Sequence, residues 1–311
     1  SSQVVISGNV FVNFNGPAIS VSSATVRPTL PWYKPNAPLD WGSYPSRSAV
    51  ITGNIIDMTC TGDTPAGRIA INISASEVTV ADNQIYVRGK SDPTVTGIML
   101  SDPALKINIH DNLISNCGTG ILTGPKSSRV VKVLDKKTFH EASLPLEWRY
   151  THQYQGWNLI WTRNGEVTGR SVIDSYDPSA LTFMLKEPYD MKDGDTFEVY
   201  SPGPASWNIH NNTITGCERP VILNNYGSET NRFCRNVIER GNAKGVKTAV
   251  SVGGRYQIID NQITGFDEPG SVGLLLKPDR FGKPMHNIYK DNLITNCSVG
   301  TSEEIPGLWK A

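Results

Sequence analysis

The chain has 311 residues, enough to bury a large core in one elongated domain or in two compact ones. Its 29 Lys and Arg balance its 29 Asp and Glu, so the composition gives no support to a nucleic-acid or membrane surface as partner. Every apolar run falls well short of the ~20 residues that span a bilayer, and the five cysteines include no CxxC pair of the zinc-ribbon kind. The 28 glycines, with abundant Asn, Ser and Thr, are typical of a turn-rich β protein.

One pattern recurs along the whole chain: aliphatic-x-aliphatic-x-x-Asn-x-aliphatic. Its first copies read "VVISGNVFV", "AVITGNIID" and "VTVADNQIY", and later copies read "INIHDNLIS" and "WNIHNNTIT". The copies centre on Asn9, Asn54, Asn83, Asn112, Asn212, Asn236, Asn261 and Asn292. Apart from two longer gaps, the spacing is about 24–31 residues, which is the range of solenoid repeats.

Each repeat also carries a second short apolar run, usually introduced by Gly, as in "TGIML", "TGILT" and "VGLLL". A repeat therefore predicts three short strands: a first strand after Gly, a second leading to Asn, and a third after Asn. Since no helical periodicity interrupts them, we expect the strands to stack coil on coil, ~4.8 Å apart, in a right-handed parallel β-helix. The aliphatic side chains would form inward columns, and the asparagines a hydrogen-bonded ladder at the bend.

On this Asn-bend repeat the sequence resembles the pectin-lyase-like superfamily of β-helix proteins. The resemblance extends over nearly the whole chain and implies an all-β solenoid, but it is specific for fold rather than for activity. The motifs of polygalacturonases and the acidic calcium cluster of pectate lyases are absent from the sequence, so no catalytic residue is carried over. We expect the β-helix in residues 1–123 and 207–311, with a small antiparallel β-subdomain inserted at 124–206.

Several cysteines recur at nearly the same offset from the repeated asparagine. Cys117, Cys217 and Cys297 each fall five residues after their Asn, and Cys60 falls six after Asn54. A metal site, a disulfide pair and an architectural column are the three explanations. We favour a column of small inward side chains and expect neither a metal nor another cofactor.

Outward positions flank the predicted bend. His110 and His210 occupy equivalent places two residues before their Asn, where we expect surface residues rather than metal ligands. Glycosylation sequons begin at Asn211 and Asn296, beside the bend and the cysteine column, where a glycan would interfere with stacking. We therefore expect a bacterial protein, secreted or periplasmic, whose signal peptide is not part of this chain.

We term the connection from a first strand to the second strand that follows it a T1 loop. Two of these loops are long. The first, "SATVRPTLPWYKPNAPLDWGSYPSRS", presents Trp32, Tyr33, Asp40 and Trp41 among prolines. These aromatic rings are suited either to stacking on sugar rings or to covering the edge of the solenoid. The second holds the inserted subdomain, in which "SYDPSALTF" predicts a hairpin with Asp-Pro at its turn.

Coils between these insertions have short T1 loops and an open outer face. Asn72 lies on this face, and Glu77 and Asp102 fall in T1 loops of adjacent coils. Two carboxylates so placed would lie on the order of 5–8 Å apart, a separation that overlaps the range used in glycoside hydrolysis. The alternative is that both residues merely cap their turns.

A second set of candidates follows the subdomain. Successive T1 loops carry Tyr226 and Glu229, then Arg255, then Asp279 and Arg280. They predict a charged stripe in which Glu229 and Asp279 are alternative catalytic carboxylates and the other residues bind substrate. The alternative is a neutralised ladder of surface ion pairs.

Taken together, these features favour a carbohydrate-active enzyme that binds a polysaccharide or oligosaccharide along the T1 side, a glycoside hydrolase more than a polysaccharide lyase. A non-catalytic glycan-binding or structural solenoid is the alternative, because no known catalytic motif is present. The first repeat, "VVISGNVFV", has no first strand before it, so we also expect upstream coils of the same parent protein to stack on it.

Overall fold

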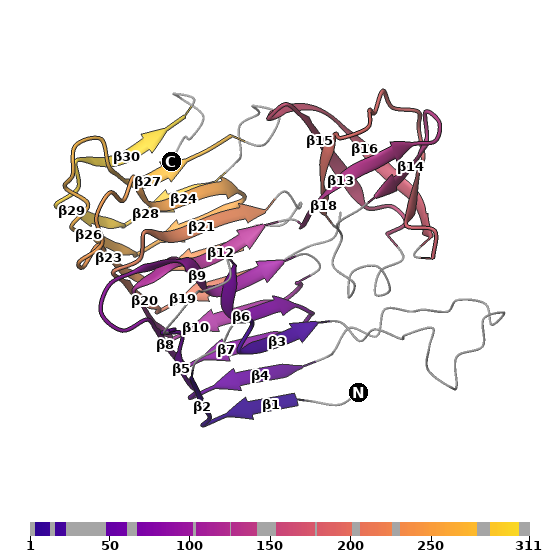
Figure 1. Ribbon diagram of the computed structural model, residues 1–311. Helices are drawn as coiled ribbons and strands as arrows, with labels where there is room; N and C mark the ends of the chain where they lie inside the picture. The colour runs from indigo at the N-terminus through magenta and orange to yellow at the C-terminus, as the bar shows by residue number, and fades with distance from the viewer. Residues whose placement is uncertain are drawn as a thin grey trace. The chain divides into compact units, whose positions relative to one another are not determined.

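The computed structural model describes residues 4–12, 16–22, 48–60, 67–101, 104–124, 126–141, 154–177, 179–200, 206–225, 231–278 and 287–304. Within these ranges the fold is all-β, as predicted, with three parallel sheets of eight strands and a closed barrel of six (Figure 1). The same ranges contain no helix able to cross a membrane. The chain divides into a solenoid unit, made of Ser1–Val21, Arg47–Gly124 and Pro204–Ala311, and a second unit that includes Pro125–Gly203.

Each coil of the solenoid contributes one strand to each of the three sheets. Sheet A holds the strands that lead to the bend: β1 (Val4–Ser7), β4 (Ala49–Thr52), β7 (Val78–Ala81), β10 (Ile107–His110), β19 (Trp207–His210), β22 (Asn231–Cys234), β25 (Tyr256–Ile259) and β28 (Ile288–Lys290). Sheet B holds the strands that follow the bend: β2 (Val10–Val12), β5 (Ile55–Asp57), β8 (Gln84–Tyr86), β11 (Leu113–Ser115), β20 (Thr213–Thr215), β23 (Val237–Glu239), β26 (Gln262–Thr264) and β29 (Leu293–Thr295). Sheet C completes each coil: β3 (Ile19–Ser22), β6 (Arg68–Ser74), β9 (Asp92–Ser101), β12 (Cys117–Gly124), β21 (Arg219–Asn225), β24 (Thr248–Gly254), β27 (Val272–Leu276) and β30 (Val299–Glu303).

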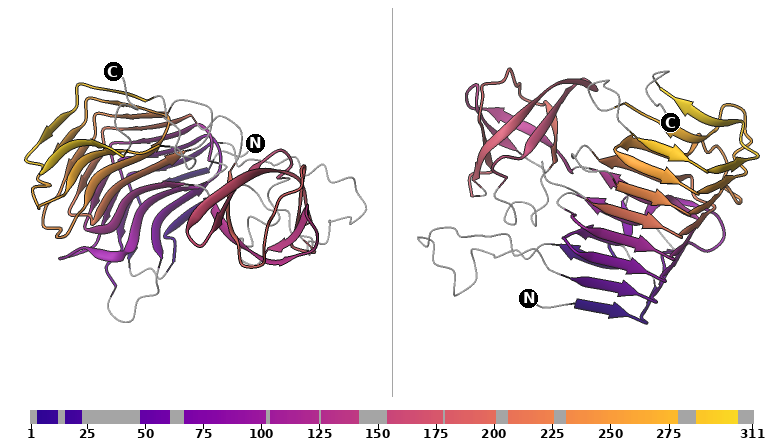
Figure 2. Two further views of the ribbon diagram at one scale, coloured as in Figure 1. Left: turned by 90° about the horizontal axis from the view of Figure 1, so that it is seen from above. Right: turned by 180° about the vertical axis from the view of Figure 1, so that it is seen from behind.

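The order of strands is the same in all three sheets and follows the chain, so every coil stacks on the one before it (Figure 2). Equivalent residues of the sequence repeat pair directly, as Ile109 does with Ile209 and Ile114 with Ile214. This pairing confirms the parallel β-helix. Both long T1 loops of the sequence connect sheet C to sheet A, one between β3 and β4 and the other between β12 and β19.

The asparagine ladder runs through all eight coils. In the central coils, Asn83 donates from its backbone NH and from Nδ2 to Oδ1 of Asn112, and Asn112 donates in the same way to Asn212. Nδ2 of Asn112 also donates to the carbonyl oxygens of Val80 and His110. A buried amide thus has all its hydrogen-bonding groups occupied, which is the condition for tolerating it in a core.

A left-handed residue precedes every ladder asparagine. Its φ lies between 55° and 67° in Gly8, Gly53, Asp82, Asp111, Asn211, Arg235, Asp260 and Asp291. Gly, Asp and Asn adopt this conformation at the lowest cost, and they hold seven of these eight positions. The residue before Asn is therefore selected by the backbone of the bend, not by chemistry at a site.

The sequons lie beside the bend and the cysteine column, as the sequence indicated, but at exposed positions. Asn211 is the left-handed residue of its bend and is exposed, while the neighbouring Asn212 is the buried ladder residue. Asn296 is exposed as well. Exposure alone does not decide whether a glycan would interfere with the stacking of coils, so this expectation and the bacterial source inferred from it stay predictions.

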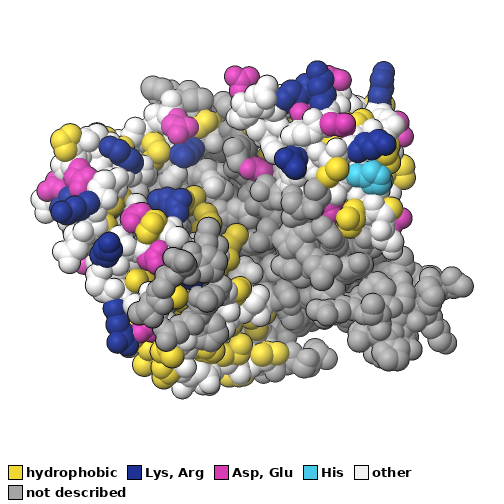
Figure 3. All heavy atoms as spheres, viewed as in Figure 1, with side chains coloured by type: hydrophobic (Ala, Val, Ile, Leu, Met, Phe, Trp, Pro, Cys, Tyr) yellow, Lys and Arg dark blue, Asp and Glu magenta, His cyan; other side chains and the backbone are white. Residues whose placement is uncertain are grey.

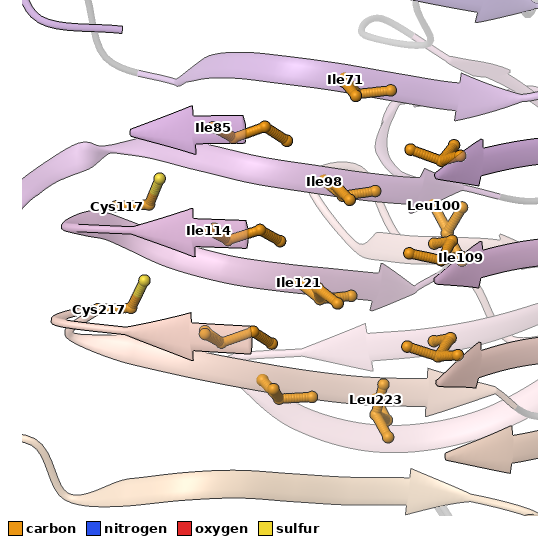
Figure 4. Close-up of a cluster of buried hydrophobic side chains, with 14 of the residues drawn as sticks. Ile71, Ile85, Ile98, Leu100, Ile109, Ile114, Cys117, Ile121, Cys217 and Leu223 are labelled. Atoms are coloured by element: carbon orange, nitrogen blue, oxygen red, sulfur yellow. The ribbon is translucent and has the colours of Figure 1, made fainter. Parts of the chain in front are cut away.

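Columns of aliphatic side chains fill the inside of the solenoid, with Cys117 and Cys217 in adjacent coils among them (Figure 4). Both cysteines are fully buried, as the column hypothesis predicted, and Cys297 packs half-buried against the same core. Cys60 is the exception. It is half-buried outside the core cluster, because Met58 supplies the inward side chain of that coil.

The glycines Gly97, within β9, and Gly120, within β12, are required by packing. A Cβ added to Gly97 would meet the carbonyl oxygen of Gly120 at 2.6 Å, and one added to Gly120 would meet that of Pro220 at 2.4 Å. The methyl groups of Ile114 and Ile214 close the same space from sheet B, at 2.9 and 2.8 Å. Adjacent coils approach so closely here that a larger side chain does not fit.

The insertion folds as a closed antiparallel barrel with its own core. Its strands are β13 (Lys126–Val133), β14 (Thr138–Glu141), β15 (Asn158–Arg163), β16 (Glu166–Asp177), β17 (Thr182–Leu185) and β18 (Thr196–Tyr200), in the order β13-β14-β17-β16-β15-β18. Aromatic rings pack edge to face in the centre, as Phe139 does against Trp161 and Phe197. The hairpin predicted at "SYDPSALTF" is confirmed, since Asp177 pairs with Thr182 and its carboxylate accepts bonds from the NH groups of Ser179 and Ala180.

Candidate functional site

Sheet C presents one continuous outward column that crosses seven coils. The strand register places in it Asn72, Met99, Leu122, Ile222, Ser251, Leu275 and Ser302. These side chains alternate with inward residues such as Ile73 and Leu100, so they are directed away from the core. The column therefore forms a face on which apolar side chains are flanked by an amide and two hydroxyls.

Two polar atoms on this face have no hydrogen-bond partner within the part of the chain that the structure describes. They are Oδ1 of Asn72 and Oγ of Ser101, each removed from solvent. Ser101 is fully buried and ends β9, one outward position beyond Met99. Leaving such a group unpaired costs on the order of 1–3 kcal/mol.

A third polar group is held on the same face two coils further on. Asn224 follows Ile222 in β21, and its Oδ1 would lie 2.7 Å from a Cβ added to Gly253 in the next coil. The side-chain amide of Asn224 therefore lies over Gly253. Oγ1 of the buried Thr123 accepts a bond from the NH of Asn224, at 2.8 Å, and donates to its carbonyl, at 3.2 Å. The backbone of Asn224 is therefore held by Thr123.

Of the residues predicted from sequence, Asn72 lies on this face and Glu77 at its T1 edge. Glu77 is exposed and has a φ of 59°. Its Oε1 forms an ion pair with Nζ of Lys106, in the next coil, at 3.5 Å. Both side chains are well solvated, so the pair contributes little to stability. Arg255 lies in a T1 connection several coils away, where its carbonyl accepts bonds from the backbone and side chain of Asn231. The structure does not bring Arg255 together with Glu77.

The remaining predicted site residues lie outside the described ranges, and their roles stay predictions. They are the carboxylates Asp102, Glu229 and Asp279, and the binding candidates Trp32, Tyr33, Asp40, Trp41, Tyr226 and Arg280.

No family model matches the chain, and a search of curated proteins finds no match. The residues themselves must therefore support any functional conclusion.

Sequence reasoning missed the residues of this face beyond Met99, among them Leu122, Ile222 and Asn224. Leu122, Ile222 and Asn224 are outward by the period-two alternation of "TGILT" and "RPVILN", so the signal was present in the printed sequence. These residues are uncharged and lie in strands, whereas most of the predicted candidates are charged or aromatic residues in loops.

A second polar cluster lies on the outer side of sheet A. The rings of His110 and His210 stack with their centroids 5.0 Å apart, and Nδ1 of His110 is 2.6 Å from a carboxylate oxygen of Asp111. Oδ1 of Asn108 accepts from Nδ2 of Asn208 and faces Nε2 of His210. Burial, followed by the charge of His110, lowers the pKa of His210. Among the described residues no group of three or more His, Cys, Asp or Glu is placed to hold a metal ion, this cluster included.

Proposed function

We propose that the protein is a carbohydrate-active β-helix protein of the pectin-lyase-like kind, which binds a polysaccharide along the outer face of sheet C on the T1 side. The observation that supports this most is the column from Asn72 to Ile222, where apolar side chains repeat from coil to coil beside the unpaired atoms of Asn72 and Ser101. A sugar ring has an apolar face and a polar edge, so a row of apolar side chains with polar groups beside it suits such a ligand.

Hydrolysis of the bound glycan is the reaction we propose, in preference to lyase chemistry. Glu77 at the T1 edge and Asp102 in the next T1 loop are the first pair of carboxylates to test, followed by Glu229 and Asp279. One carboxyl group would protonate the leaving oxygen while the other acts as base or nucleophile. Secretion of the protein to the outside of the cell or to a periplasm is part of the same proposal, because that is where polysaccharides are met.

A non-catalytic glycan-binding module is the second candidate. It is favoured by the state of Glu77, the candidate carboxylate within the described ranges, which is exposed and paired with Lys106. A catalytic carboxyl group is more often partly buried and free of such a partner.

The experiment is a panel of neutral and acidic polysaccharides, assayed for binding, for new reducing ends and for unsaturated uronate products. Ile222→Lys should abolish binding, whereas Thr79→Lys, an outward change on sheet A, should leave it intact. Glu77→Gln and Asp102→Asn should abolish product without weakening binding if these residues catalyse. Binding without any product would establish the second candidate, and neither binding nor product on any glycan would reject both.

A further inference from the structure

The outer face of sheet C carries no charge in its central column. That column crosses seven coils from Asn72 to Ser302 and consists of amide, hydroxyl, thioether and aliphatic side chains. Its large apolar members are half-buried, so part of each side chain is accessible. They are Met99, Leu122, Ile222 and Leu275. A ligand lying along this column would therefore meet apolar and uncharged polar groups from coil to coil.

The outward columns on either side of the central one add little charge. In the column nearer the start of the strands, the exposed Arg219 pairs in register with Thr119 of the coil before it. The column toward the T1 edge ends in Lys277 and Glu304, which form an ion pair with each other at 3.9 Å. Within the described residues of these three columns, Arg219 is the one charge outside that pair.

The other two sheets do carry charged residues on their outer faces. Arg232 pairs in register with Asn208 in an outward column of sheet A, and Glu239 with Thr215 in one of sheet B. Figure 3 shows Lys, Arg, Asp and Glu side chains gathered over the edge of the solenoid where β23, β26 and β29 lie. The parallel β-helix therefore tolerates charge on its outer faces, and the uncharged column is a property of sheet C itself.

On the basis of the proposed function, we infer that the polysaccharide bound along sheet C is neutral, with sugars that carry hydroxyl groups but neither carboxylates nor amines. A carboxylate on each sugar would lie against Met99, Leu122 and Ile222 without a counter-charge. Moving an unpaired charge out of water costs far more than moving a hydroxyl group that finds a partner. The side-chain amides of Asn72 and Asn224 are uncharged partners of the kind that hydroxyl groups need.

A neutral ligand also limits the reaction. A lyase removes the proton beside a uronate carboxyl group, which stabilises the negative charge that then develops, and a neutral sugar has no such group. Hydrolysis requires protonation of the glycosidic oxygen and attack on the sugar by water or a carboxylate, and a neutral sugar allows both. A neutral ligand and hydrolysis are therefore expected together.

The test uses matched pairs of ligands. Linear oligosaccharides of glucose, galactose and mannose are each compared with an oxidised form, in which the primary alcohol of every sugar has become a carboxylate. Isothermal titration calorimetry with the whole chain measures both members of each pair at about 0.1 M and about 1 M salt. For a pair that binds, the neutral member should bind at least about tenfold more tightly than the oxidised one. Its affinity should change by less than about twofold with salt, because no ion pair contributes to it.

Leu122→Arg adds a cation to the middle of the column. It should weaken binding of the neutral member and strengthen binding of the oxidised member, so that the preference reverses. The matched control is Thr79→Arg, which adds the same charge to the outer side of sheet A and should change neither affinity. Circular dichroism should show that both variants keep their β structure.

Three results would overturn the neutral ligand while leaving glycan binding established. They are an oxidised member that binds as tightly as its neutral parent, binding of the neutral member that is lost in high salt, and a folded Leu122→Arg variant whose preference is unchanged. If no member of any pair binds, the proposed function fails and the neutral ligand fails with it.

Discussion

Asn83 and Asn112 are joined by two hydrogen bonds to one oxygen. The backbone NH and Nδ2 of Asn83 both donate to Oδ1 of Asn112, at 3.1 and 2.9 Å, and both residues are fully buried. Because the same pair of bonds recurs from coil to coil, the ladder fixes the register of each bend against the next. The bend cannot slip by one residue without leaving buried amide groups unpaired.

Replacing Asn112 by Ala should therefore destabilise the solenoid by on the order of 3 kcal/mol, because it leaves donors of Asn83 and carbonyls of Val80 and His110 without partners. The matched control is Asn108→Ala, four residues earlier on the outer side of β10, where half-buried bonds to Asn208 and His210 are lost instead. It should cost about 1 kcal/mol or less. Urea unfolding followed by circular dichroism measures both, and equal losses would show that the ladder carries no special stability.

How much of the fold could be predicted depends on how periodic each feature is. The ladder asparagines recur in every coil, and glycines such as Gly97 and Gly120 mark the same point of sheet C in several coils. Their spacing alone predicted three strands and a bend. Closure of the barrel could not be predicted, because β13 pairs with β18 across about 70 residues and no repeat marks that pairing. The candidate site was only partly predictable for the same reason. Register shows that Leu122 and Ile222 face outward, but no pattern in the sequence shows that Oδ1 of Asn72 lacks a partner.

Glycine at position 120 should resist even the smallest side chain. Gly120→Ala places a methyl group 2.4 Å from the carbonyl oxygen of Pro220 and 2.8 Å from Ile214, so the coils must separate. We expect a loss of about 1–3 kcal/mol. Gly124 lies in the same strand with no atom within 4 Å of an added Cβ, so Gly124→Ala should stay within about 0.5 kcal/mol of the parent. Thermal unfolding of the two variants side by side measures the difference, and a harmless Gly120→Ala would contradict the close approach of the coils.

The buried cysteines Cys117 and Cys217 should react very slowly with alkylating reagents in the native protein. Hydrogen bonding with Cys217, followed by burial, raises the pKa of the Cys117 thiol well above its ordinary value of 9.0, so it has almost no thiolate to react. With iodoacetamide at mildly alkaline pH, Cys117 and Cys217 should react more slowly than the half-buried Cys60 by at least about two orders of magnitude. Peptide mass spectrometry measures each rate, and unfolding in urea should make all three equally reactive. Rapid native labelling of Cys117 would show that the column opens to solvent.

The ion pair of Arg68 and Asp92 should make stability depend on pH in the acid range. The Arg68 side chain is fully buried, donates from Nη1 to the carbonyl of Met58 at 2.6 Å, and contacts the Asp92 carboxylate through Nη2. Burial acts to raise the pKa of Asp92, but hydrogen bonds from Thr94 and then the charge and bond of Arg68 outweigh it and lower that pKa below its ordinary value of 3.8. Since the folded pKa is the lower one, the stability from Asp92 is complete above 3.8 and is lost as the pH falls through the folded value.

Asp92→Asn tests this directly, because it leaves the buried guanidinium without its counter-charge at every pH. At neutral pH the variant should be less stable by about 3 kcal/mol. The difference in the free energy of unfolding between parent and variant should narrow as the pH is lowered below 3.8, because the parent carboxylate then becomes protonated as well. Asp267→Asn is the matched control, since Asp267 forms an exposed pair with Arg240 at 2.8 Å and should contribute about 0.5 kcal/mol or less. Urea midpoints measured from neutral pH down to about pH 2.5 give the two curves. A gap for Asp92→Asn that stays constant over this range would show that the carboxylate stabilises the fold by its shape and not by its charge.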